Sequence, residues 1–351
     1  MKRFYCDCKN ELFFENRYCE SCQKVVGFDI ESFDMVTLNS IDHEFLEASD
    51  GRMFRRCDNW ISHDVCNWLI PHDSEHSLCE GCQLNRTVPN QMVVDILPPI
   101  NYLRWLRLEE AKKRLIFTLR SLGLPLVSGW VDPKQGLLFD FLEPLKCGEC
   151  ESAVNITTGY AGGLVTINSV EADDVARVSA KAALNERQRT ILGHFRHETG
   201  HYFWDKVFRE SSSNTKFEKI FGDPSVSYQE SLSSYYHNGP PEGWNENFIS
   251  AYASAHPSED WAETWNHYLL IHDGLETAFE LELTPCSPRD LDIKDTLIAW
   301  RKFAIEINHV NRSIGLHDAY PYVISKNVEK KMTYVDSLVV KISRVQHQIR
   351  K

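Results

Sequence analysis

The chain has 351 residues, of which 42% are apolar and 25% charged, as in ordinary folded globular proteins. Its formal net charge of −12 disfavours a large surface that binds nucleic-acid phosphates, because such binding rests on lysine and arginine. The sequence has no run of 18 apolar residues and no apolar segment near its start. We therefore expect no membrane span, no secretory signal and a cytoplasmic location.

The first cysteines occur as two short pairs. Cys6 and Cys8 flank one residue, and Cys19 and Cys22 flank two. Eleven cysteines are many for a reducing compartment, where metal ligation is a better default than disulfides. Two chelating loops can supply the four thiolates of a tetrahedral zinc site, so these four residues are predicted to hold one structural zinc ion.

A second set of cysteines follows within the first 90 residues. Cys79 and Cys82 form a tight pair, and Cys57 and Cys66 are predicted to complete a second zinc site with them. Three histidines nearby are substitute ligands, namely His63, His72 and His76. The alternatives are free buried cysteines, or ligands mixed between the two sets. Because this region shows few core residues, metal binding is expected to contribute to its folding.

Long helical periodicity starts only after Pro98 and Pro99, so residues 1–90 are expected to form a zinc-ribbon region and residues 91–351 a second domain. The second domain begins with apolar residues at helical spacing over 102–122. Short apolar runs predict strands at 126–127, 137–142 and 163–168. Further helical patterns cover 171–182, 185–209, 214–222, 228–236, 258–272, 289–308 and 326–349. The pattern indicates an α+β fold with a helix-rich second domain.

The segment His197-Glu198-Thr199-Gly200-His201 carries the strongest chemical signal. His197 and His201 are four residues apart, so a helix presents both imidazoles on one face. Glu198 lies about 100° round the helix, where it can hold a metal-bound water and accept its proton. The alternative is two histidines at this spacing by chance, but the apolar residues around the segment argue against it.

A catalytic zinc ion usually has three protein ligands, so a third must lie elsewhere. Trp204 and Val207 stand where a metzincin would have glycine and histidine, which excludes that class. Glu259 and Glu263 are four residues apart at the start of an expected helix. We assign Glu259 as the third ligand and Glu263 as the acceptor that orients a ligand histidine, although the reverse assignment is also open.

Several segments resemble the bacterial zinc-binding metallopeptidases that carry an N-terminal zinc ribbon. They cover nearly the whole chain and read FYCDCKNELFFENRYCESC, CNWLIP with CEGCQLNRT, GHFRHETGHYFWD and HPSEDWAETWNHYL. The resemblance implies a zincin-like catalytic domain after the ribbon module. The run Glu-Asp-Trp-Ala-Glu is also similar to a helix of lethal-factor-like metallopeptidases, whose first glutamate binds zinc; this implies Glu259 here.

The same resemblance implies two further roles. Tyr252, seven residues before Glu259, would donate a hydrogen bond to the transition-state oxyanion; the alternative is a packed aromatic residue at a helix end. The segment 162–168 would be the edge strand beside the active site. The backbone of Gly163, Leu164 and Val165 would then pair with an extended peptide.

Together these features predict a gluzincin-like zinc peptidase with one catalytic and two structural zinc ions, acting on a peptide or protein. The first alternative is a zinc-dependent amidase or other hydrolase with a non-peptide substrate. The second is a protein-binding ribbon module attached to an idle zincin domain, against which the intact Glu198 argues. The ribbons could bind a protein partner, whereas nucleic acid and membrane are not expected. No site is assigned to Cys147, Cys150 and Cys286.

Overall fold

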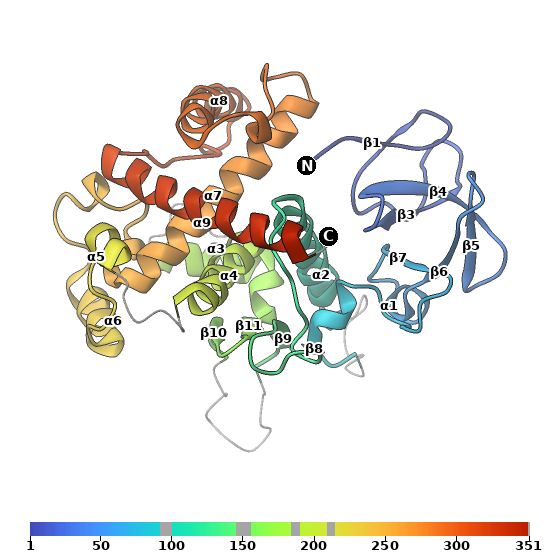
Figure 1. Ribbon diagram of the computed structural model, residues 1–351, viewed down its shortest axis with the longest axis horizontal. Coiled ribbons are helices and arrows are strands. Elements are labelled where there is room, and N and C mark those ends of the chain that lie inside the picture. The colour runs from blue at the N-terminus through green and yellow to red at the C-terminus, as the bar shows by residue number, and fades with distance from the viewer. Residues whose placement is uncertain (92–99, 145–155, 184–189, 209–214, 350–351) are drawn as a thin grey trace.

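The computed structural model describes residues 1–91, 100–144, 156–183, 190–208 and 215–349. A strand-rich N-terminal part lies beside a larger, helix-rich part (Figure 1). This arrangement confirms the expected α+β class, with a ribbon region followed by a helix-rich domain. Within the described residues, no helix is both long and apolar enough to cross a bilayer.

The N-terminal part contains more regular structure than the sequence indicated. A hairpin of β1 (Phe4–Tyr5) and β2 (Glu11–Leu12) precedes an antiparallel sheet in the order β3-β4-β5-β6-β7. Its strands are β3 (Val25–Asp29), β4 (Asp34–Ser40), β5 (Phe45–Ala48), β6 (Met53–Arg56) and β7 (Leu69–Pro71). The helix α1 (Asp58–Ile61) and the 3-10 turn η1 (Cys82–Leu84) carry cysteines at or beside their first residues.

This sheet has a true aromatic core, so the expectation of few core residues was wrong. Phe14, Phe28 and Trp68 are buried, and the ring centroids of Phe28 and Trp68 lie 5.1 Å apart. Phe117 reaches this core from the helix α2 (Ile100–Ser121), with its ring 5.5 Å from that of Phe14. The first helix of the larger part therefore closes the core of the N-terminal part.

The larger part contains a second sheet in the order β10-β11-β9-β8. Its strands are β8 (Asn85–Thr87), β9 (Leu138–Leu142), β10 (Gly159–Ala161) and β11 (Leu164–Asn168). β8, β9 and β11 are parallel, whereas β10 runs antiparallel to β11. Since β8 follows directly after the second cysteine set, the expected boundary at residue 90 falls after the first strand of this sheet.

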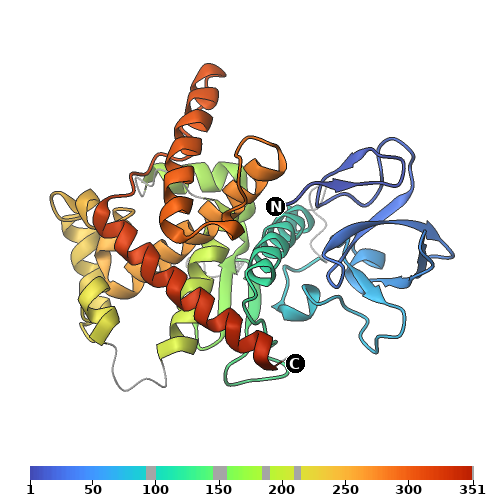
Figure 2. The ribbon, with the colours of Figure 1, turned by 45° about the horizontal axis from the view of Figure 1, so that its top comes forward.

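Helices make up most of the larger part. They are α3 (Asp174–Ala183), α4 (Ile191–Phe208), α5 (Thr215–Phe221), α6 (Tyr228–Asn238), α7 (Pro257–Glu280), α8 (Ile293–Ser313) and α9 (Lys326–Ile349), with the 3-10 turns η2 (Ser169–Ala172), η3 (Trp244–Glu246), η4 (Tyr252–Ala255) and η5 (Pro288–Asp290). α4 and α7 pack together in the interior, where Phe203 stacks on Trp265 with ring centroids 4.8 Å apart. α8 projects from this helical body (Figure 2).

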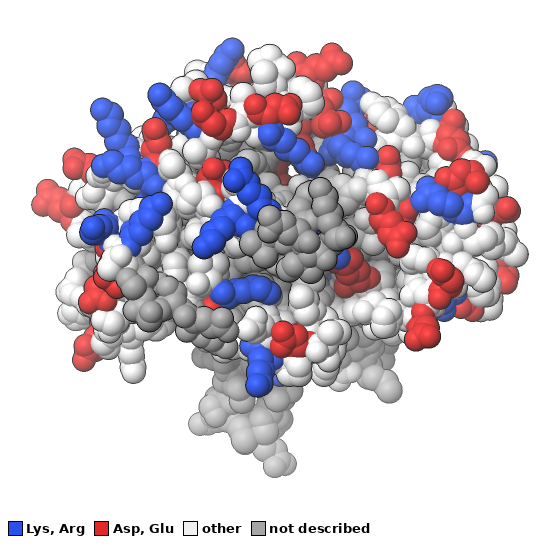
Figure 3. Space-filling view, in the orientation of Figure 1, with Lys and Arg blue, Asp and Glu red and all other residues white. Residues whose placement is uncertain are grey.

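The surface carries charges of both signs. Lysine and arginine side chains are interspersed with aspartate and glutamate over the face in Figure 3. Acidic residues outnumber basic ones in the whole chain, 50 to 38. The net charge of −12 therefore comes from an excess of carboxylates within a mixed surface.

Candidate active site and metal centres

Two packed helices bring three donor side chains to one point. His197 and His201 lie on α4, and their Nε2 atoms are 3.3 Å apart. Glu259 on α7 places Oε2 3.1 Å from Nε2 of His197 and Oε1 3.4 Å from Nε2 of His201. All three ligand atoms lie within 4.8 Å of one another. Two imidazoles and one carboxylate form the donor set of a catalytic zinc site, so the residues fit this metal.

Small residues allow α4 and α7 to approach closely at this point. A Cβ added to Gly200 would lie 3.0 Å from Cα of Ala262 and 3.2 Å from the ring of Trp265. Trp261 donates a hydrogen bond from its indole nitrogen to the carbonyl oxygen of Gly200, at 2.8 Å. The glycine between Glu198 and His201 therefore lets a helix that carries two imidazoles lie directly against the helix that carries the carboxylate.

Glu263 holds His197 from the side opposite the donor cluster. Its Oε1 lies 2.7 Å from Nδ1 of His197, which leaves Nε2 directed at Glu259. Ser250 fixes the other oxygen of Glu263 by donating a hydrogen bond at 2.6 Å. Burial would raise the pKa of Glu263, but the hydrogen bond and charge of His197 outweigh it and lower that pKa. Glu259 and Glu263 thus occupy different positions, one at the donor cluster and one behind a ligand.

Glu198 lies next to the donor cluster on α4 and is only 7% exposed. Within the described part of the chain, its carboxylate forms no hydrogen bond. Its negative charge also acts on Tyr228. Burial raises the pKa of the Tyr228 phenol most, and the negative charges of Glu259 and Glu198 raise it further. The site therefore contains a nearly buried carboxylate that is available to a bound molecule.

Two tyrosines lie beside Glu259, one of which the sequence did not identify. Tyr252, in η4, has its ring centroid 6.0 Å from that of His197. Burial and the negative charge of Glu259 raise the pKa of Tyr252 well above its ordinary value, so its hydroxyl keeps its proton at neutral pH. Tyr228, at the start of α6, donates a hydrogen bond to Oε1 of Glu259 at 2.9 Å.

The strand nearest the site differs from the expected one. β11 is paired on both sides, with β9 and β10, so the prediction that it forms an edge of the sheet was wrong. Gly163 does not belong to the strand, because Gly162 and Gly163 form the turn between β10 and β11, both at positive φ. Among the described residues the edge on this side is β10, whose Tyr160 stacks on His201 with ring centroids 6.4 Å apart.

The first cysteine set lies at the surface of the ribbon. The Sγ atoms of Cys6 and Cys22 are 3.5 Å apart, and those of Cys8 and Cys19 are 3.6 Å apart. Four thiolates around zinc at about 2.3 Å would be separated by about 3.8 Å, so these distances fit a tetrahedral site and exclude disulfides. Cys8 and Cys22 are exposed.

The second set, in contrast, is completely buried. Cys57, Cys66, Cys79 and Cys82 meet with Sγ distances of 3.6 Å from Cys66 to Cys79 and 3.7 Å from Cys66 to Cys82. Backbone N–H groups donate to two of the sulfur atoms, from Cys79 to Cys57 and from Trp68 to Cys66, each at 3.4 Å. The same tetrahedral geometry therefore fits here. All four candidate ligands come from the second set of cysteines, and no histidine belongs to this cluster.

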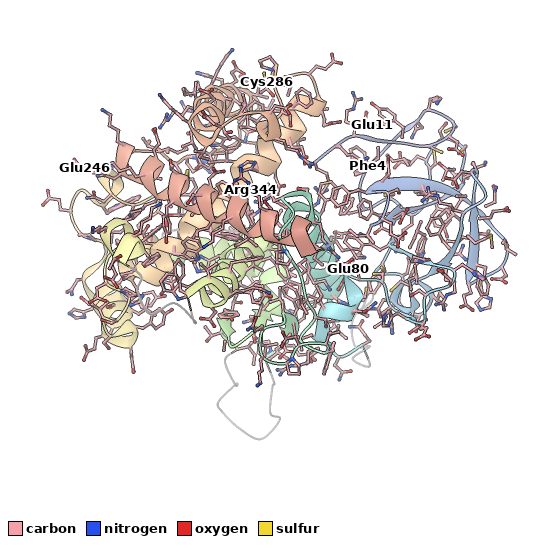
Figure 4. All side chains as sticks on the ribbon, viewed as in Figure 1. Phe4, Glu11, Glu80, Glu246, Cys286 and Arg344 are labelled. Carbon is pink, nitrogen blue, oxygen red and sulfur yellow. The ribbon has the colours of Figure 1, made fainter. Side chains whose placement is uncertain are left out.

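Of the remaining cysteines, the structure describes only Cys286, which joins none of these clusters. Cys147 and Cys150 lie outside the described residues. Cys286 is exposed in the segment between α7 and η5 (Figure 4).

The helix-rich fold, the His-His-Glu cluster and the two four-cysteine clusters define a zinc-binding protein of the metallopeptidase class. Residues 101–338 match the family described as "Putative zinc-binding metallo-peptidase", and residues 3–93 match a zinc-ribbon domain. The chain therefore belongs to this metallopeptidase family and carries a zinc-ribbon domain before the matched peptidase residues.

Relatives of similar length occur in mycobacteria. An uncharacterized protein of Mycobacterium bovis and two from strains of Mycobacterium tuberculosis are each 36% identical to this chain. Each alignment covers 98% of this chain and 96% of the relative. No solved structure matches the chain.

Proposed function

We propose that this protein is a gluzincin-type zinc peptidase that hydrolyses peptide bonds with Glu198 as its general base. The observation that carries the proposal is the convergence of His197, His201 and Glu259 within 4.8 Å, next to a Glu198 carboxylate that forms no hydrogen bond within the described residues. Zinc in such a site acts as a Lewis acid on the scissile carbonyl and makes water a nucleophile near neutral pH. Two further zinc ions would occupy the cysteine clusters.

In this proposal, Glu198 accepts the proton of the attacking water and passes it to the leaving amine. Tyr252 donates its protonated hydroxyl to the oxyanion that develops on the substrate carbonyl. Glu263 keeps the ring of His197 in the orientation that offers Nε2 to the metal. These roles use three groups at three positions around the donor cluster.

The substrate is proposed to be a peptide or protein, which the description of the matched family supports. An amidase with a compact non-peptide substrate would use the same zinc and the same general base, so the substrate class needs its own test.

Cleavage of a peptide library tests the proposal. Glu198→Gln should retain the zinc content of the wild type and lower the rate of cleavage by about 10²–10⁴-fold, because general base catalysis contributes that much. Glu306→Gln makes the same change at an exposed position on α8 and should leave cleavage unchanged. Full turnover by the Glu198→Gln chain would refute the mechanism, and a zinc-loaded wild type that cleaves no peptide would refute the substrate class.

A further inference from the structure

Tyr228 contacts the carboxylate that closes the donor cluster. Its hydroxyl donates to Oε1 of Glu259 at 2.9 Å, and Glu259 is only 1% exposed. A carboxylate in so enclosed a place needs a hydrogen-bond donor for lone pairs that a metal does not use, because water cannot reach them. We propose that Tyr228 is a positioning residue for Glu259 and that it couples the docking of α6 to occupancy of the metal site.

The helix that carries Tyr228 lies at the surface. None of the residues of α6 is buried, and the helix has only 11 residues. Isolated helices shorter than about 12–15 residues are marginal in water. Ser227 caps the first turn by accepting from the backbone N–H of Glu230, and Gly239 ends the helix at positive φ. These local features shape the ends of α6 but do not attach it to the rest of the protein.

Two ring contacts of α6 lead to the metal site. The ring of Tyr228 packs edge-on against His256, with centroids 5.1 Å apart, and His256 caps the helix that carries Glu259. One turn before the end of α6, the ring of Tyr235 lies 5.8 Å from that of Tyr252. Both contacts and the Tyr228 hydrogen bond therefore end on residues that form or flank the donor cluster.

Coupling of this kind must act in both directions. A metal that fixes the Glu259 carboxylate also fixes the acceptor of the Tyr228 hydroxyl, so it should favour the docked position of α6. Docked α6 in turn holds Glu259 in its ligating orientation and should strengthen metal binding. The inference rests on the metal-binding part of the proposed function and does not depend on hydrolysis.

The test compares Tyr228→Phe with Tyr236→Phe. Both variants lose one hydroxyl from the same helix, but Tyr236 is 63% exposed and lies outside the donor cluster. Native mass spectrometry counts bound zinc while a mild chelator is added, and the His201→Ala chain identifies which zinc is the catalytic one. Loss of a hydrogen-bonded partner of a ligand typically weakens metal binding 10–100-fold, so this loss is expected for Tyr228→Phe alone.

Hydrogen exchange measures the other direction of the coupling. In the wild type and in Tyr236→Phe, exchange of the amides in α6 should slow when the catalytic zinc binds. In Tyr228→Phe it should not respond to zinc. Zinc affinity of Tyr228→Phe within twofold of the wild type, or exchange in wild-type α6 that ignores zinc, would overturn the proposal. A chain with zinc-dependent α6 that cleaves no peptide would support the coupling and refute the proposed hydrolysis.

Discussion

At the scale of single residues, His267 is a buried histidine that no metal cluster uses. It is 2% exposed on α7, and its Nδ1 lies 3.0 Å from the hydroxyl of Tyr320. Burial lowers the pKa of His267 from 6.5 to about 4, which outweighs the opposite effect of Glu263. The native protein therefore keeps this side chain neutral at pH values at which an unfolded chain would protonate it.

This difference predicts a loss of stability in acid. Below pH 6.5 the unfolded state binds a proton at His267 that the native state does not, so stability falls as the pH falls toward 4. At pH 5 the effect amounts to about 2 kcal/mol. His267→Gln should remove it, and the stability of the variant relative to the wild type should improve by that amount between pH 8 and pH 5, measured by urea unfolding.

The comparison removes effects common to both chains, such as release of zinc from the cysteine clusters in acid. His309→Gln, at an exposed position on α8, serves as the control and should follow the wild type at both pH values. Parallel loss of stability in the wild type and His267→Gln would show that this residue does not contribute to the acid sensitivity.

Sequence spacing identifies site residues that lie near one another in the chain, but it does not identify Tyr228. His197, Glu198 and His201 occupy little more than one helical turn, so their geometry follows from helix periodicity alone. Tyr228 lies 31 residues before Glu259, and helix periodicity does not relate the two positions. Only the packing of α6 and η4 brings its hydroxyl to the carboxylate, and packing of this kind leaves no local pattern.

At the scale of elements, contact between α4 and α7 depends on Gly200. A methyl group there would lie 3.0 Å from Cα of Ala262, which is backbone and cannot rotate away. Gly200→Ala should therefore separate the two helices, with a cost of about 1–3 kcal/mol in the free energy of unfolding. It should also weaken binding of the catalytic zinc, because the histidines and Glu259 lie on opposite sides of this contact. Thermal unfolding and zinc content measure the two effects.

Gly193 on the same helix provides the matched control. A methyl group at Gly193 would meet the hydroxyl of Thr190 at 2.9 Å and the side-chain amide of Asn266 at 4.0 Å, and both are ends of side chains. Gly193→Ala should change stability little, because the gain of about 0.5–1 kcal/mol for alanine in a helix offsets the loss of about 0.5–2 kcal/mol when the Thr190 hydroxyl gives up its hydrogen bond from the Gly193 N–H. Equal stability and zinc content in both variants would contradict the role assigned to the Gly200 contact.

Differences between expected and observed elements have physical causes. The helix expected at 258–272 continues through Gly274 as part of α7. A Cβ at Gly274 would lie 2.6 Å from the ring of Trp300 on α8, so this glycine is needed for close packing and does not end the helix. The sheet β3–β7 was missed in part because β3 is buried throughout and β4 along most of its length, so neither strand shows the alternation that marks a strand. β10 has three residues, which is too short for a pattern.

At the scale of the whole molecule, the second cysteine cluster lies where the ribbon meets the larger part. Three charged side chains of α2 are buried beside it, namely Glu109, Lys112 and Lys113. Glu109 lies 2.7 Å from Nζ of Lys112 and accepts a hydrogen bond from Asn85 at 2.9 Å. On the same interface Glu80, labelled in Figure 4, lies 2.7 Å from Nε of Arg120 on α2. The larger part thus supplies the charged surroundings of this cluster.

Lys113 is the residue best placed to compensate the charge of the cluster. Burial alone would lower its pKa, but the nearby Cys66 and Cys82 outweigh this and raise it, so the side chain stays a cation. Four thiolates with one zinc ion carry about two negative charges, which are costly to bury without such a cation. The first cluster has exposed ligands, Cys8 and Cys22, and water can solvate its charge.

The two clusters should therefore release zinc in a fixed order and respond differently to one substitution. A thiol-modifying reagent should free the zinc of the first cluster first, because its thiolates are accessible, while the buried second cluster retains its metal until the interface opens.

Lys113→Met should leave the first release unchanged and speed the second by about 10–100-fold, since it leaves the buried charge uncompensated. A chromogenic zinc indicator follows both phases, and Lys302→Met, at an exposed position, is the control. Release of both ions in one phase would contradict the predicted order. A second phase unaffected by Lys113→Met would mean that Lys113 does not stabilise the metal of the second cluster, and the order of release would then come from accessibility alone.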